Sequence, residues 1–193
     1  MQGNELIASA AAPFTEACRA VSDEQLGAPT PCAEFTVRGL VNHLLFWGPS
    51  LLGGARKTAQ PPPAPSDQDI DLLGGHWRET LLRQTGELVT AWQDPAAWEG
   101  STWIGATELP GPMVGGMVFT EFVMHGWDLS RAIGRTPEWD ADVLKFAVEF
   151  LNSTAEMGRE YGAYGPRVTV PSDASTLDVA LGLSGRDPAW TPA

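Results

Sequence analysis

The sequence predicts an all-α protein: a bundle of four or five helices, with an additional short helix near the C-terminus. Apolar residues recur every three or four positions in separate stretches, which is the spacing of helices with one buried face. No stretch shows the sustained alternation of apolar and polar residues that is typical of a half-buried strand. Segments rich in Gly and Pro separate the stretches. Together these features favour a helical bundle.

The first two predicted helices carry clear apolar stripes. One helix is expected from about Asn4 to Val21. After a loop, Thr36 has the residue type of an N-cap for the second helix. The buried stripe of that helix is predicted to contain Val37, Leu40, Val41, Leu44 and Leu45. Pro49 is expected to end or kink it, because proline lacks an N–H and crowds the preceding turn.

Three further helices are expected. The stiff, proline-rich segment QPPPAPSDQD precedes a helix from about Leu72 to Trp92. The segment 94–116 is rich in Gly and Pro and is compatible with a short hairpin. A helix from about Met113 to Ile133 follows, and Gly134 is expected to end it at the C′ position. The last long helix is expected from about Asp140 to Met157.

The chain length of 193 residues suits a single domain over residues 1–193. The last part, about 160–193, reads as an extended piece, one short helix and a final turn. We expect this C-terminal extension to pack on the bundle.

The composition limits the classes of partner. The formal net charge is −12, and an acidic surface repels phosphate backbones and anionic lipid headgroups. We therefore expect no nucleic-acid partner and no membrane partner. The sequence shows neither an apolar run of about 18 residues nor a secretory signal. Two cysteines are too few for a disulfide framework, so a reducing, cytoplasmic location fits best.

The two cysteines receive different interpretations. Cys18 falls on the apolar face of the first predicted helix and is interpreted as a core residue. Cys32 follows Thr-Pro in a loop, with no base or CxxC partner to support a catalytic role. We therefore assign neither thiol to catalysis.

A carboxylate and an imidazole interrupt the strongly apolar stretch VFTEFVMHGWDL. Glu121 and His125 are four residues apart, so they share one face of a helix. An unpartnered buried carboxylate is unfavourable by roughly several kcal/mol, and something must offset that cost. His43 lies at the flank of the apolar stripe of the second helix. Whether the two helices are neighbours or diagonal in the bundle, His43 can reach the other two residues.

Two imidazoles and one carboxylate are a common ligand set for a divalent metal, with positions left open for water or substrate. Another interpretation needs no metal. A Glu-x-x-x-His pair often forms an intrahelical hydrogen bond, and a lone helical His is usually a core or surface residue. The pattern by itself leaves both interpretations open.

Residues near the predicted ligands also have two interpretations each. Asp128 either orients a ligand or, as we favour, caps the helix or pairs with an arginine such as Arg131. Trp47 and Trp127 either line a substrate pocket or, as we favour, belong to the core. His76 is interpreted as a solvated residue at a helix start, with a role as an acid, base or extra ligand as the alternative.

Two motifs, TPCAEFTVRGLVNHLL and EFVMHGWDLSRAIGR, resemble the actinobacterial branch of the DinB-like superfamily. This branch includes the N-terminal domain of mycothiol-dependent maleylpyruvate isomerase and related thiol S-transferases. The ending VPSDASTLDVALGLSGRDPAW is also similar, so the resemblance covers nearly the whole chain. It implies a DinB-like four-helix bundle, to which the short C-terminal helix and the small hairpin would be additions.

The resemblance further implies a metal site at one end of the bundle, holding zinc usually and nickel sometimes. Carried over residue by residue, its ligands are His43, Glu121 and His125. Mycothiol is the implied thiol cosubstrate. Pro49 departs from the family pattern near the first ligand and is expected to reshape the pocket wall. The isomerase also has a C-terminal domain for which this chain leaves no room, so the isomerase reaction itself is not carried over, and no catalytic acid or base is implied.

A metal with open positions can activate either a thiol or a water molecule. We expect an enzyme of the first kind: a metal-dependent transferase or isomerase that uses a thiol on a small electrophilic substrate. The alternatives are a thiol-independent hydrolase or lyase and a non-enzymatic protein that binds a metal or a small molecule. A homodimer is an open expectation, because bundles of this kind often dimerise.

Overall fold

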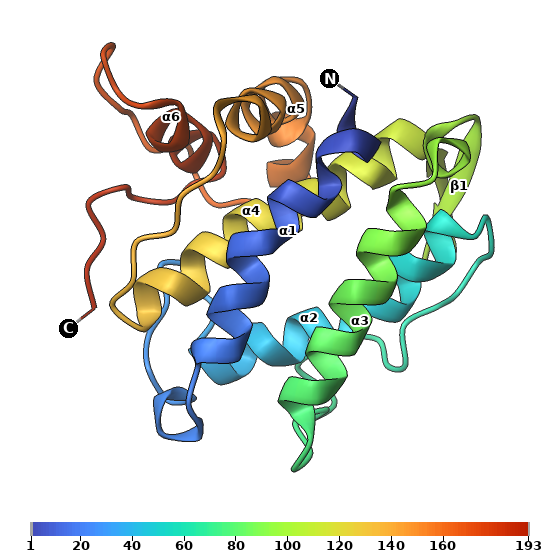
Figure 1. Ribbon diagram of the computed structural model, residues 1–193, viewed down its shortest axis with the longest axis horizontal. Coiled ribbons are helices and arrows are strands. Elements are labelled where there is room, and N and C mark those ends of the chain that lie inside the picture. The colour runs from blue at the N-terminus through green and yellow to red at the C-terminus, as the bar shows by residue number, and fades with distance from the viewer. Residues whose placement is uncertain (1, 193) are drawn as a thin grey trace.

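The computed structural model describes residues 2–192 and is an all-α, DinB-like bundle with one small hairpin. The four bundle helices are α1 (Gly3–Ala20), α2 (Val37–Ala55), α3 (Trp77–Trp92) and α4 (Gly111–Ala132). Helix α1 packs against α3 and α4, and α2 also packs against α3 and α4 (Figure 1). Helices α2 and α4 are therefore neighbours, which resolves the choice that the sequence left open.

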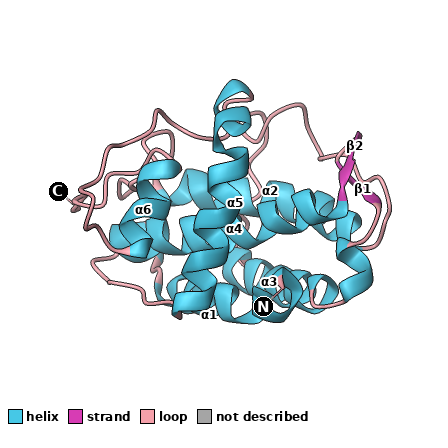
Figure 2. Ribbon diagram, turned by 90° about the horizontal axis from the view of Figure 1, so that it is seen from above, coloured by secondary structure: helices cyan, strands magenta, loops and turns pink. Residues whose placement is uncertain are grey.

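The remaining elements lie on the outside of the bundle. Helix α5 (Ala141–Glu160) packs against α1 and α4, and α6 (Thr176–Leu183) packs against α5. Strands β1 (Ser101–Ile104) and β2 (Thr107–Pro110) form the predicted hairpin, antiparallel, with Ser101 opposite Pro110. The hairpin lies at the end of the molecule away from the C-terminus (Figure 2). Two short 3-10 turns, η1 (Asp23–Gln25) and η2 (Pro95–Trp98), complete the described elements.

Most helix ends agree with the local signals. The hydroxyl oxygen of Thr36 accepts a hydrogen bond from the Gly39 amide at 3.3 Å, as expected of an N-cap. Gly134 follows α4 with a φ of 75°, the left-handed conformation that ends helices at the C′ position. Helix α3 begins later than predicted, at Trp77. The backbone amide of Leu72 instead donates to Oδ1 of Asn42 at 2.8 Å, which holds this segment outside the helix.

Helix α2 does not end at Pro49 but continues to Ala55. The neighbouring helix stabilises this region, because the buried Gln84 side chain donates to the Leu44 carbonyl at 2.8 Å. Gly48 makes room for that amide, since a Cβ at this position would overlap the Gln84 side chain. Tertiary contacts thus override the helix-breaking tendency of proline.

The core is continuous from α1 through the bundle to α6. Cys18 is fully buried within it, as predicted, and Trp127 is a core residue as well. Within the described residues, none of the helices combines the length and the apolar character that crossing a membrane requires.

Candidate metal centre

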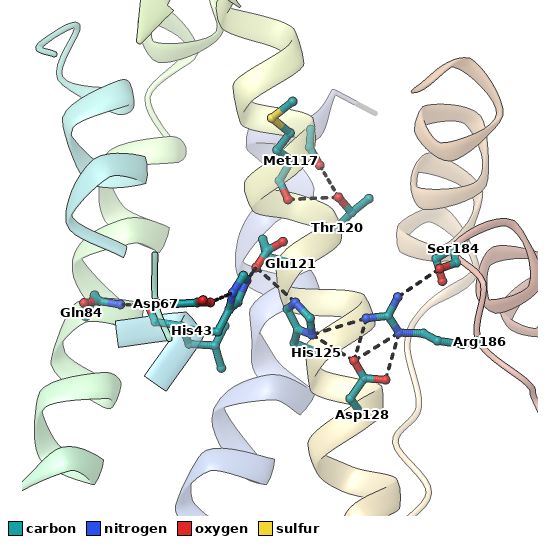
Figure 3. A network of polar contacts seen from close by, with 12 residues as sticks. His43, Asp67, Gln84, Met117, Thr120, Glu121, His125, Asp128, Ser184 and Arg186 are labelled. Atoms are coloured by element: carbon teal, nitrogen blue, oxygen red, sulfur yellow. Dashed lines mark hydrogen bonds and ion pairs between the residues drawn. The ribbon is translucent and has the colours of Figure 1, made fainter. Parts of the chain in front are cut away.

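Three side chains from two neighbouring helices converge at one point. Helix α2 supplies His43, and α4 supplies Glu121 and His125 (Figure 3). Oε2 of Glu121 is 3.7 Å from Nε2 of His43 and 3.4 Å from Nε2 of His125. One donor atom from each residue lies within 4.8 Å of the other two. The structure therefore brings together all three residues that the sequence singled out.

Each imidazole is also hydrogen-bonded to a carboxylate of its own through Nδ1, the ring nitrogen that does not face Glu121. Nδ1 of His43 is 2.7 Å from Oδ2 of Asp67, and Nδ1 of His125 is 2.9 Å from Oδ2 of Asp128. An ionised carboxylate can only accept, so each Nδ1 carries the proton and donates it. The lone pairs of both Nε2 atoms are then directed toward Glu121. This is the arrangement by which carboxylates orient histidine ligands in metal sites.

Asp67 reaches the site from the long loop between α2 and α3. Asn42 fixes this loop, because its side-chain amide donates to the carbonyls of Asp67 at 2.6 Å and Ile70 at 2.9 Å. Arg38 adds an exposed ion pair to Asp71 at 2.5 Å. The wall of the site beside His43 is therefore formed by this anchored loop and not by the next turn of α2.

Asp128 pairs with an arginine, as the favoured interpretation held, but its partner is not the nearby Arg131. Arg131 donates instead to the carbonyl of Trp190 at 2.8 Å. Asp128 is fully buried and pairs with Arg186, which follows α6. Nε of Arg186 donates to Oδ1 at 2.9 Å and Nη2 donates to Oδ2 at 2.7 Å, a bidentate geometry. Asp128 thus links the C-terminal segment to His125.

The charges of the cluster shift its pKa values. Burial acts to raise the pKa of Glu121, but the positive charges that His125 and His43 carry when protonated outweigh it and lower the pKa to about 2. Burial acts to lower the pKa of His43, and Glu121 and Asp67 together raise it above its usual value. The pKa of Asp128 falls in spite of burial, because Arg186 and His125 favour its ionised form. Glu121 and Asp128 are therefore ionised at neutral pH.

A cavity of about 250 Å³ opens beside the three donors. Its walls include Cys32, Phe35, Tyr164 and Arg186 as well as the ligand candidates. Burial raises the pKa of the Cys32 thiol, so this cysteine is not an activated nucleophile, in line with the sequence.

The other sequence candidates lie away from this cavity. The side chain of His76 is 91% exposed, in line with its interpretation as a solvated residue. Trp47 is half-buried and lines a small apolar pocket on the other side of Glu121. Pro49 lines neither pocket.

The residues present fit a divalent cation. The donors are two imidazole nitrogens and a carboxylate oxygen, the set that zinc accepts in sites with an open position. Asp128 and Arg186 offset each other, whereas Glu121 and Asp67 leave two negative charges that a divalent ion would balance. Nickel accepts the same donors.

Sequence reasoning missed Asp67, Arg186 and Tyr164. Each comes from a loop or from the C-terminal segment rather than from a bundle helix. Asp67 lies in the acidic run SDQD, Tyr164 in the segment YGAYGP and Arg186 in the triplet GRD, and no periodicity connects any of these stretches to a helix face. Their placement depends on how the chain folds back on the bundle.

Comparison with known proteins agrees with this architecture. Residues 7–130 match the family model of the mycothiol maleylpyruvate isomerase N-terminal domain. Two uncharacterized proteins of Mycobacterium tuberculosis, from strains CDC 1551 and H37Rv, are each 28% identical over 131 residues, which is 68% of this chain. The matched region spans 65% of these curated relatives.

Two crystal structures share the fold. The mycothiol-dependent maleylpyruvate isomerase superposes with a TM-score of 0.66 at 14% identity, over 97% of this chain and 89% of that one. A histidine-to-alanine mutant of that isomerase gives a TM-score of 0.62 at 14% identity, over 98% and 80%. The family match covers more than half of the chain. The chain therefore belongs to the mycothiol maleylpyruvate isomerase N-terminal domain family.

Proposed function

We propose that this protein binds one divalent metal ion through His43, Glu121 and His125 and uses a low-molecular-weight thiol to act on a small electrophile. The reaction is a transfer of the thiol or an isomerisation that passes through its addition. The observation that carries the proposal is the pair of oriented imidazoles. Two separate carboxylates, Asp67 and Asp128, direct both Nε2 atoms toward Glu121 beside an open cavity.

This geometry is costly to maintain without a ligand. Glu121 comes from an otherwise apolar helix face, and its neighbours Phe122, Val123 and Met124 are buried. A structural hydrogen bond between Glu121 and His125 would not need a third residue from α2, or a carboxylate behind each imidazole. A zinc or nickel ion bound there would supply positive charge that lowers the pKa of an approaching thiol.

We assign Tyr164 to the binding of the substrate. It lines the same cavity, which Thr120 and His125 also line. Burial raises the pKa of Tyr164, so the hydroxyl keeps its proton at neutral pH. It can then donate a hydrogen bond to an oxygen on which negative charge develops.

Mycothiol is the proposed thiol, because the family model and the structural neighbours both carry its name. The cavity of about 250 Å³ holds a small electrophile together with the sulfur end of a thiol. The bulk of a larger thiol would remain outside.

The proposed function is tested by thiol-dependent turnover. Zinc- or nickel-loaded protein is mixed with mycothiol and either a bimane or chlorodinitrobenzene, and the rate is compared with that of the protein-free reaction. We expect acceleration by wild type and by His76→Ala, and none by His43→Ala. A fully metal-loaded protein that accelerates none of these reactions would contradict the proposal, and thiol-independent turnover would favour a hydrolase or lyase.

A further inference from the structure

We infer that the electrophile accepted by this pocket is uncharged or cationic and carries no free carboxylate. The inference rests on the proposed function and narrows it to one class of substrate. It comes from the charges around the cavity and from the hydrogen bonds that already engage its one guanidinium.

The cavity has an acidic lining. Glu121 lies beside the two imidazoles, and Asp67 lies behind His43 at the end of the anchored loop. Glu34 adds a third carboxylate, and this one is exposed to solvent. These three carboxylates come from α4 and from two different loops, so the acidic character extends over several walls of the cavity.

Arg186 is the one arginine or lysine among the described residues that line the cavity. Its Nε and Nη2 atoms are bound to the two oxygens of Asp128, and Nη1 points to the carbonyl of Ser184 at 3.4 Å. The residue is only 6% exposed. The charge of Arg186 is therefore already offset by the buried carboxylate of Asp128, and drawing the guanidinium toward a substrate carboxylate would weaken that buried pair.

The charges around the cavity disfavour the binding of a second anionic group beside the thiolate. A divalent ion would balance Glu121 and Asp67, after which a thiolate returns the centre to a net negative charge. A carboxylate on the second substrate would face this charge and Glu34 without a cation. At a few ångströms, like charges weaken binding by about tenfold or more. Maleylpyruvate, a dicarboxylate, falls outside the class that we infer.

A matched pair of aryl chlorides tests the inference. 4-Chloro-3,5-dinitrobenzamide and 4-chloro-3,5-dinitrobenzoate have the same ring and leaving group and differ in charge. In both, the thiolate sulfur bonds to the ring carbon, chloride leaves with the electron pair of the C–Cl bond, and the thiol proton goes to solvent. Each catalysed kcat/KM is divided by the uncatalysed rate constant of the same compound. We expect this ratio to be at least about tenfold higher for the amide.

A charge-reversal variant tests whether the acidic lining of the cavity causes the preference for the amide. Glu34→Lys places a cation beside the cavity, and we expect it to reduce the preference for the amide by about tenfold. Glu149→Lys on α5 changes the net charge of the protein equally, but Glu149 does not line the cavity. It should leave the preference as in wild type. Equal normalised rates for the two compounds, or the same change in both variants, would overturn the inference.

A binding measurement separates this inference from the proposed function. The protein is loaded with Co²⁺ and titrated with 2-mercaptoethanol or 3-mercaptopropionate, and the sulfur-to-cobalt absorption band reports occupancy. After correction for the ionisation of each thiol, we expect the neutral thiol to bind at least about tenfold more tightly. Equal affinity would overturn the charge inference alone. The absence of a band with either thiol would overturn the proposed function and, with it, the inference that rests on it.

Discussion

The carboxylate of Asp128 lies 2.9 Å from Nδ1 of His125, three residues earlier on the same helix. Arg186, in the C-terminal segment, forms an ion pair with the same carboxylate. The orientation of one ligand candidate therefore depends on a chain segment that is remote in sequence. We expect this link to serve both the stability of the fold and the affinity of the metal centre.

Asp128→Asn should affect both properties. The variant leaves the buried Arg186 charge uncompensated, and we expect the free energy of unfolding to fall by about 3–5 kcal/mol. Metal affinity should fall about 10–100-fold, because His125 loses its orienting carboxylate. Urea unfolding and competition with a chelating dye measure the two effects. The double variant Asp128→Asn/Arg186→Met should recover stability but not affinity, and recovery of both would contradict an orienting role.

Asp67→Asn should affect metal affinity alone. Asn42 anchors the loop between α2 and α3 through the backbone carbonyls of Asp67 and Ile70, so Asp67→Asn should change the free energy of unfolding by less than about 1 kcal/mol. Metal affinity should fall about 10–100-fold, because Nδ1 of His43 loses its charged carboxylate acceptor. The matched control is Asp69→Asn, an exposed change two residues away. Equal affinities in the two variants would show that Asp67 does not orient His43.

Two glycine substitutions test whether the Gln84 side chain packs against α2 at Gly48, next to Pro49. At Gly48 an added methyl group would overlap the Gln84 side chain, so Gly48→Ala should destabilise the fold by about 1–3 kcal/mol. At Gly86 on α3 a methyl group meets nothing within 4 Å, so Gly86→Ala should stabilise the fold by up to about 1 kcal/mol. Thermal and urea unfolding measure both. A neutral Gly48→Ala would mean that Gln84 does not occupy this position.

The stability of the fold should decline in alkali because of Cys18. Burial raises the pKa of this thiol well above 9.0, so it stays protonated in the folded chain while it ionises in the unfolded chain. Its contribution is therefore complete below about pH 9 and is lost as the pH rises toward the folded pKa, by about 1.4 kcal/mol per pH unit. Between pH 9 and 10, where ionisation of the unfolded thiol is still incomplete, wild type should lose about 1 kcal/mol more stability than Cys18→Ala. If the free energy of unfolding falls equally with pH in wild type and in Cys18→Ala, Cys18 is not the buried, protonated thiol that we infer.

The fold was largely predictable because its helices carry local signals. Thr36 and Gly134 have the residue types of helix ends, and the apolar stripe of α2 gives its buried face directly. The errors arose where tertiary contacts overrode these signals. Asn42 holds Leu72 outside α3, and Gln84 donates to the α2 backbone near Pro49. Sequence spacing alone does not contain such contacts.

The candidate site was predictable in part for the same reason. Glu121 and His125 share a helix face by spacing, His43 lies at the flank of the apolar stripe of α2, and the family resemblance implies the same three residues as ligands. Asp67 and Arg186 are held by a loop and by the segment after α6, whose paths are set by long-range packing. The interpretation of Asp128 named the wrong arginine, because the true partner is 58 residues away, whereas Arg131 is only three residues away.

Metal content tests the central claim most directly. The three histidines of the chain provide matched variants: His43→Ala and His125→Ala remove two of the proposed ligands, and His76→Ala removes an exposed imidazole. Elemental analysis of untagged protein should find about one equivalent of zinc or nickel in wild type and in His76→Ala, and almost none in the other two. Wild-type protein that stays metal-free after reconstitution, or equal metal in all three variants, would contradict the account.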